Sequence, residues 1–193
     1  MLNTKEKLKL CLKEEKKYYI SRKPVRDRML DWITKDPCIK IWEYQKALRY
    51  TEYYSFQKGI KKLILYTLMR RRKNILGAKL GIEISERSFQ EGLIIFHSGN
   101  IVVNGYSRIG KECRLHGNNC IGNDGISDDA PRIGNRVDIG VGAKIIGNIT
   151  IADDIVIGAG AVVTHSFFKP GIVIAGIPAR EIHPVEQKMR GKK

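Results

Sequence analysis

The stretch RIGNRVDIGVGAKIIGNITIADDIVIGAGAVV, residues 132–163, decides the fold. An aliphatic residue stands at every sixth position through it, six times in succession. A helix repeats every 3.6 residues and a strand every two, so neither element alone produces this period. The recurring positions are Ile133, Ile139, Ile145, Ile151, Ile157 and Val163.

The repeat extends in two ways. The same spacing holds earlier in the chain, at Val103, Ile109, Leu115 and Ile121. A second row stands four residues after each anchor and is small or aliphatic throughout: Val137, Ala143, Ile149, Ile155 and Ala161. A six-residue period predicts a parallel β-helix, in which each coil is three short strands and the anchors stack inside. The pattern begins near Gly81.

The first eighty residues have a different pattern. In EYQKALRYTEYYSFQKGIKKLILYTLMRRRK, residues 43–73, apolar and aromatic side chains recur every three or four positions, with Lys and Arg between them. This spacing predicts helices. Asp36-Pro37 separates this segment from an earlier helix, and Gly77 is the expected helix stop. We therefore expect an N-terminal α-helical region (1–80) that covers one end of the β-helix, a β-helical domain (81–182) and a basic C-terminal tail (183–193).

Charge and composition limit the partners. The formal net charge of +15 suggests anionic ligands or surfaces, although solvated helix faces account for much of it. No aromatic-interleaved basic motif points to nucleic acid, and the four cysteines lack metal-ligand spacing. The N-terminus is too charged for a signal peptide, and no apolar run is long enough to cross a membrane. We expect a cytoplasmic protein without a metal or nucleic-acid partner.

At IGVGAKIIGNITIADDIVIGAGAVVTHSFFKPGIVIAGIPAREI, residues 139–182, the sequence resembles the hexapeptide-repeat acyltransferases, most closely the serine acetyltransferases and their relatives in polysaccharide biosynthesis. The resemblance implies a left-handed coil, homotrimers with active sites between subunits, and acetyl-CoA as co-substrate.

The resemblance also places the donor site. The family's backbone contacts to the pantetheine arm match Asn123, Val141 and Ala159, which are 18 positions apart and are expected to stack, because one coil is three six-residue strands. Thr164 and His165 match a Thr-Lys pair that follows the last full repeats, and His165 would make a weaker phosphate contact than lysine. Arg180 matches a residue near the nucleotide phosphates.

His97 falls on the family's catalytic histidine in FHSGNIVVN, residues 96–104. A positioned imidazole is needed because an alcohol at neutral pH is a poor nucleophile. Glu83, in the EIS step, matches the carboxylate that orients this imidazole, with one residue fewer between the two. His116 lies 19 residues after His97 and could either shape the acceptor pocket or fill a corner.

Two departures concern the acceptor. Phe96 stands where serine-specific relatives carry an aspartate, and Ala130 stands where they carry a second histidine. An aromatic ring suits a sugar face, and the loop residues Asn123, Asp124, Asp128 and Asp129 suit hydroxyl groups. The sequence thus favours an O-acetyltransferase acting on a lipid-linked or nucleotide-linked sugar in surface polysaccharide biosynthesis, with the basic helices able to associate with an anionic membrane. The alternatives are L-serine as acceptor, an N-acetyltransferase acting on an amino sugar, and a non-catalytic trimeric scaffold.

Overall fold

The structure is a computed structural model that describes residues 2–21 and 24–184. The helices are α1 (Lys5–Lys16), the π-helical η1 (Lys17–Ser21), α2 (Val25–Thr34), α3 (Pro37–Ser55) and α4 (Ile60–Leu80). The strands are β1 (Ile82–Ile84), β2 (Ile94–Ile95), β3 (Ile101–Val103), β4 (Arg108–Ile109), β5 (Arg114–Leu115), β6 (Cys120–Gly122), β7 (Arg132–Ile133), β8 (Asp138–Ile139), β9 (Lys144–Ile146), β10 (Thr150–Ile151), β11 (Val156–Ile157), β12 (Val162–Val163), β13 (Ile172–Gly176) and β14 (Ala179–Pro184).

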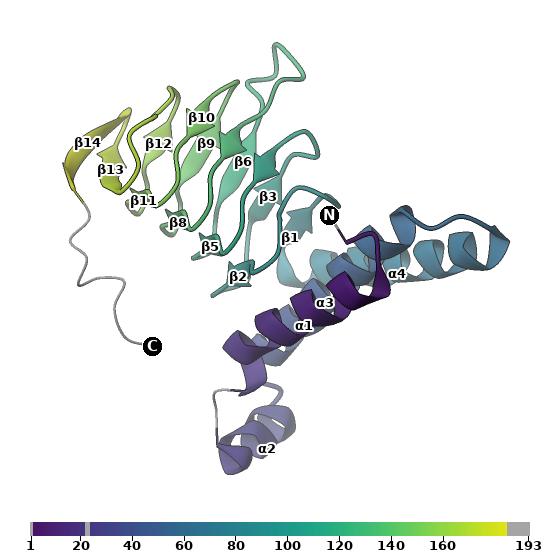
Figure 1. Ribbon diagram of the computed structural model, residues 1–193. Coiled ribbons are helices and arrows are strands. Elements are labelled where there is room, and N and C mark those ends of the chain that lie inside the picture. The colour runs from purple at the N-terminus through teal and green to yellow at the C-terminus, as the bar shows by residue number, and fades with distance from the viewer. Residues whose placement is uncertain (1, 22–23, 185–193) are drawn as a thin grey trace.

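The strands wind into a stack of coils with three flat faces (Figure 1). Face A has the strand order β1-β3-β6-β9-β12, face B has β4-β7-β10, and face C has β2-β5-β8-β11-β13-β14. Neighbouring strands run parallel, and β14 closes face C by pairing antiparallel with β13. The arrangement is the predicted parallel β-helix.

The six-residue anchors form the core of this stack. Ile133 pairs in register with Ile109 and Ile151, and Ile145 pairs with Ile121 and Val163. Each of these side chains is at most 4% exposed. Burying one aliphatic side chain stabilises a fold by about 1.5–3 kcal/mol, so the repeated column is the main source of stability in this half of the chain.

One coil is longer than the others. Leu115 pairs with Ile139, 24 positions later, whereas Ile139 pairs with Ile157, 18 positions later. The extra residues lie in the segment 123–131 between β6 and β7, which projects from the stack (Figure 1). Across this insertion, residues that stack on adjacent coils are 24 positions apart in the sequence and not 18.

The helical layer covers the first coil, and tyrosine side chains of this layer accept hydrogen bonds from the exposed strand edge of that coil. The N–H of Ile84 donates to the Tyr44 hydroxyl at 3.1 Å, and the N–H of Ile95 donates to the Tyr19 hydroxyl at 2.8 Å. Exposed strand edges recruit other chains, so these side-chain acceptors replace the missing previous coil. The helices therefore cap the β-helix, as their position in Figure 1 indicates.

A buried arginine joins this cap to the β-helix. Arg49 of α3 is 1% exposed and forms an ion pair with Glu15 of α1 at 2.7 Å and with Glu52 at 3.1 Å. It also donates to the carbonyl oxygens of Phe89 and Gln90 at 2.9 and 2.6 Å. Burial disfavours the charged guanidinium, but the Glu15 carboxylate outweighs that effect and raises the pKa of Arg49 above its usual value.

Two details of the helices differ from expectation. The segment 43–73 is not one helix. It is divided between α3 and α4, and Gly59, with a φ of 99°, is the residue before α4 begins. Gly77 does not end this helix, which continues to Leu80 and ends at Gly81 in the left-handed conformation. Gly77 is instead a contact point, because a Cβ there would collide with the Ile82 carbonyl oxygen. The break at Asp36-Pro37 is confirmed, since the Asp36 side chain caps α3 by accepting from the Cys38 N–H at 2.8 Å.

The last described strand is β14, which includes residues 183 and 184 of the expected basic tail. Residues 185–193 lie outside the described residues. Within residues 2–21 and 24–184, no helix is both long enough and apolar enough to span a membrane.

Candidate active site

His97 lies at the corner where the chain passes from β2 on face C to β3 on face A, which we call the C–A corner. Its side chain is exposed. In the next coil Gly117 passes beneath it with a φ of 107°, and a Cβ at Gly117 would lie 3.3 Å from the His97 Cβ. Glycine at this position therefore allows the corner turn and leaves room beside the imidazole.

The strand registers place His97 at the head of a column along this corner. Ile95, Leu115, Ile139 and Ile157 pair in succession on face C, so the residues two positions later also stack: His97, Gly117, Val141 and Ala159. The N–H groups of Gly142 and Gly160 donate to the carbonyl oxygens of Gly117 and Val141 at 3.0 and 2.8 Å, which joins the coils. Val141 and Ala159 are exposed on this column.

Two backbone donors on the column are free. Among the residues that the structure describes, the N–H groups of Val141 and Ala159 donate no hydrogen bond. Exposed N–H groups of this kind can bind the amide carbonyls of an extended pantetheine arm. The Gly140 backbone lies so close to the next coil that a Cβ would come 2.7 Å from the Ala159 nitrogen, so the coils stay tightly stacked along this line.

Asn123 does not belong to this column, and its expected stacking beneath Val141 is wrong. The longer coil puts Asn123 after β6, at the corner between faces A and B, where its side chain donates to the Ser127 carbonyl at 2.6 Å. Counting 18 residues back from Val141 fails because the insertion 123–131 lies in between. Gly117 occupies the position expected for Asn123.

The projecting segment 123–131 is held by its own side chains. Asp124 accepts from the backbone N–H groups of Ile126 and Ser127 at 2.9 and 3.1 Å, and these hydrogen bonds hold its pKa below the usual range. Asp128 is exposed, and Ala130 is buried where the segment returns to β7. Within one chain this segment and His97 lie at different corners of the coil.

Glu83 lies in β1 on the outside of face A, in register with Val102. It lines a cleft beside α4 together with Arg70, Lys73 and Asn100. Among the described residues, no hydrogen bond or ion pair joins Glu83 to His97. The pairing of these two side chains stays a prediction.

Among the histidines whose side chains the structure describes, His116 is the one with a carboxylate partner. Its Nε2 lies 2.6 Å from Oδ1 of Asp138, and its ring stacks on Phe96 with the centroids 4.5 Å apart. The other oxygen of Asp138 lies 3.4 Å from Nη1 of Arg114. The sequence did not predict that Arg114 and Asp138 are neighbours, because a count of 18 residues per coil does not align them. The 24-residue coil places them in register on adjacent strands.

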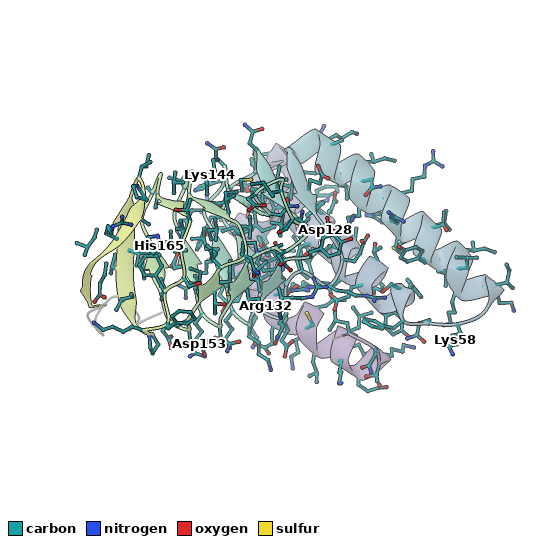
Figure 2. All side chains as sticks on the ribbon, turned by 90° about the horizontal axis from the view of Figure 1, so that it is seen from above. Lys58, Asp128, Arg132, Lys144, Asp153 and His165 are labelled. Atoms are coloured by element: carbon teal, nitrogen blue, oxygen red, sulfur yellow. The ribbon has the colours of Figure 1, made fainter. Side chains whose placement is uncertain are left out.

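The remaining donor candidates meet at the far end of the stack. Nη1 of Arg180 lies 3.5 Å from Nε2 of His165, whose ring packs on Phe167 at 4.6 Å between centroids. Figure 2 shows His165 beside β13 and β14, at the opposite end of the β-helix from the helical layer. Thr164 precedes it and is exposed. Within the described ranges no group of three or more His, Cys, Asp or Glu side chains is placed to hold a metal ion.

Known proteins share both the sequence and this architecture. The serine acetyltransferase of Helicobacter pylori strain 26695 is 31% identical over 132 residues, which covers 67% of this chain and 77% of that protein. The chain belongs to the family of the serine acetyltransferases, the hexapeptide-repeat acetyltransferases. The serine acetyltransferase of Staphylococcus xylosus is 31% identical over 172 residues, covering 81% of this chain and 78% of that protein. No protein-family model matches the sequence.

Solved structures of serine acetyltransferases share the fold of this chain. The Neisseria gonorrhoeae serine acetyltransferase superposes with a TM-score of 0.71 at 26% identity, covering 93% of this chain and 67% of that one. The Brucella abortus serine acetyltransferase in complex with coenzyme A superposes with a TM-score of 0.68 at 23% identity, covering 94% and 68%. The predicted fold, a left-handed parallel β-helix behind an N-terminal helical region, is confirmed. This hexapeptide-repeat acetyltransferase is an acetyl-CoA-dependent acyltransferase.

The prediction of a sugar acceptor in polysaccharide biosynthesis is wrong. The relatives that match this acetyltransferase in sequence and in structure are named serine acetyltransferases. The prediction rested on Phe96, read as a platform for a sugar ring. The structure gives that ring another partner, because Phe96 stacks on the His116 imidazole.

Proposed function

We propose that this chain is a serine O-acetyltransferase, which moves the acetyl group of acetyl-CoA to the side-chain hydroxyl of L-serine. The observation that carries the proposal is the column His97, Gly117, Val141 and Ala159 along the C–A corner. Three coil spacings of about 4.8 Å separate Ala159 from His97, so a pantetheine arm laid along the column brings its thioester toward the imidazole. We infer L-serine as the acceptor because the relatives are named serine acetyltransferases.

The chemistry follows from this placement. His97 removes the proton of the serine hydroxyl as its oxygen attacks the thioester carbonyl, which gives a tetrahedral oxyanion. Collapse breaks the carbon–sulfur bond and expels the CoA thiolate, which takes the proton from the imidazolium. The products are O-acetylserine and CoA, and no acyl-enzyme is formed. In this proposal Glu83 orients His97, the free N–H groups of Val141 and Ala159 hold the pantetheine arm, and Thr164, His165 and Arg180 face the phosphates.

A homotrimer is part of the proposal. The segment 123–131 and His97 occupy different corners of one coil, so a site that uses both draws them from two chains. Asn123, Asp124 and Asp128 then belong to the site of a neighbouring subunit. Sedimentation of the full chain tests this arrangement, and a monomer that retains full activity contradicts it.

The test of the activity is thiol release from acetyl-CoA with and without L-serine, with the product identified by mass spectrometry. We expect serine-dependent release and O-acetylserine. His97→Ala should lower kcat by about 10²- to 10⁴-fold, the usual contribution of one general base. Arg136→Gln, which alters a side chain that is 48% exposed at the corner between faces B and C, away from both proposed parts of the site, is the matched control. Release that does not depend on serine, or a fully active and folded His97→Ala variant, overturns the proposal.

A further inference from the structure

We propose that Arg114 and Asp138 bind the two charged groups of the acceptor, with the guanidinium facing the carboxylate of L-serine and Asp138 facing its ammonium. His116 and Phe96 are positioning residues for this pair. This inference rests on the proposed serine acetylation. It adds the residues that select a zwitterionic amino acid from other alcohols.

Their position relative to His97 is the first argument. Arg114 and Asp138 point outward from adjacent strands of face C, in register with each other. Each stands three positions before its coil's member of the column, Gly117 and Val141. At about 3.3 Å per residue that is about 10 Å along the strand, and His97 lies one coil spacing of about 4.8 Å beyond Gly117 and two beyond Val141, a separation that the long arginine side chain covers in part. A small amino acid can therefore touch this pair at one end and present its hydroxyl at the corner.

The hydrogen bonds of Asp138 are the second argument. One carboxylate oxygen is held firmly by His116 at 2.6 Å, which fixes the direction of the group. The other oxygen has only a long contact of 3.4 Å with Arg114. Arg114 carries five N–H donors and, among the described residues, its side chain has no other recorded partner. Both groups thus keep bonding capacity for a charged ligand.

Exposure is the third argument. The side chains of Arg114, His116 and Asp138 are 46%, 37% and 27% exposed, so the pair is open to solvent yet partly shielded. Phe96 stacks on the His116 ring and is itself 41% exposed. A zwitterion needs one cationic and one anionic partner, and charge-assisted hydrogen bonds to such partners are the strong ones. The two positions where the family resemblance places such partners hold Phe96 and the buried Ala130.

The test measures which charge each residue recognises. Acetyl transfer is followed with L-serine, with L-serinamide, which lacks the carboxylate, and with 3-hydroxypropionate, which lacks the ammonium. We expect Arg114→Gln to raise KM for L-serine by about 10- to 100-fold and to abolish the preference for L-serine over L-serinamide. Asp138→Asn should raise KM by a similar factor and abolish the preference over 3-hydroxypropionate. KM for acetyl-CoA should stay unchanged in both variants.

A matched control removes a comparable ion pair elsewhere. Arg136 and Asp154 form a surface pair at 2.7 Å on the corner between faces B and C, and Arg136→Gln should leave every parameter unchanged. Parent-like KM and selectivity in both test variants overturn the assignment while the proposed function stands. An equal loss for all three acceptors also overturns it, since this indicates a structural role. Absence of serine-dependent transfer in the parent chain overturns the proposed function and this assignment together.

Discussion

The buried arginine of the helical cap offers the sharpest test of how this fold is held together. Replacing Arg49 by methionine keeps most of the side-chain volume and removes the charge. Glu15 and Glu52, at 0% and 3% exposure, then lose their cation, and the carbonyl oxygens of Phe89 and Gln90 lose a donor. The carboxylates cannot turn to water, because they lie between α1, α3 and the first coil.

Removing one partner of a buried ion pair costs about 3–5 kcal/mol, because the remaining charge is uncompensated. Domains are stable by only about 5–15 kcal/mol, so Arg49→Met should remove a large share of the total. Glu15 keeps its hydrogen bonds from the Gly92 and Leu93 N–H groups at 3.1 and 3.2 Å, which places the expected loss in the lower half of that range.

Urea denaturation measures the loss, with Arg136→Met as the control because exposed pairs contribute at most about 1 kcal/mol. Hydrogen exchange adds a local readout, since opening of the cap should speed exchange at Gly92, Leu93 and Ile95 before the rest of the β-helix. A loss below about 1 kcal/mol, or exchange that rises uniformly along the chain, refutes the reasoning.

Three further outcomes follow from single residues. Burial raises the pKa of the Cys11 and Cys113 thiols to about 12, so both should resist alkylation at pH 8 in the native protein and react after unfolding; rapid native labelling contradicts this. Burial alone would raise the pKa of Glu86, but its hydrogen bond from Lys73 prevails and lowers it. A lowered folded-state pKa stabilises above the unfolded value of about 4.3, so the Tm difference between the parent and Glu86→Gln should shrink as pH falls from 7 through 4, and a difference that grows refutes it. Gly77→Ala should lower Tm by several degrees through its clash with the Ile82 carbonyl, whereas Gly59→Ala, strained by its φ of 99° but in open space, should cost less; equal losses contradict the contact argument.

The fold was predictable because its signal is redundant. Each anchor such as Ile133 or Ile145 repeats the same information, and a side chain that must stack on another every coil leaves little freedom in residue type. The N-terminal region was predictable as helices that cover one end of the β-helix, but the contacts by which it does so were not. The sequence alone does not show that Tyr19 and Tyr44 supply acceptors for a strand edge, since these contacts join residues 40 or more positions apart.

The site was harder to predict because its residues depend on register. An 18-residue count is correct between Val141 and Ala159, where no insertion intervenes, and fails between Asn123 and Val141, where the longer coil begins. Insertions are tolerated at the corners of such a coil because they leave the stacked anchors in place. The spacing of the anchors therefore does not show that the coil is longer, and only the pairing of the strands does.

The sugar acceptor was predicted from Phe96 and Ala130, and the same slip in alignment hid a charged pair near them. With an 18-residue coil Arg114 aligns with Arg132, and no anion stands next to it, so Phe96 becomes the most informative side chain near His97. With the 24-residue coil Arg114 aligns with Asp138, and one cation and one anion face solvent a few residues from the imidazole. The Phe96 ring stacks on the His116 ring, which explains its presence without a sugar ligand. In a β-helix a single substitution at the site cannot be interpreted until the neighbouring coil has been correctly aligned, because side chains of that coil contact it, as His116 contacts Phe96 and Asp138 contacts His116.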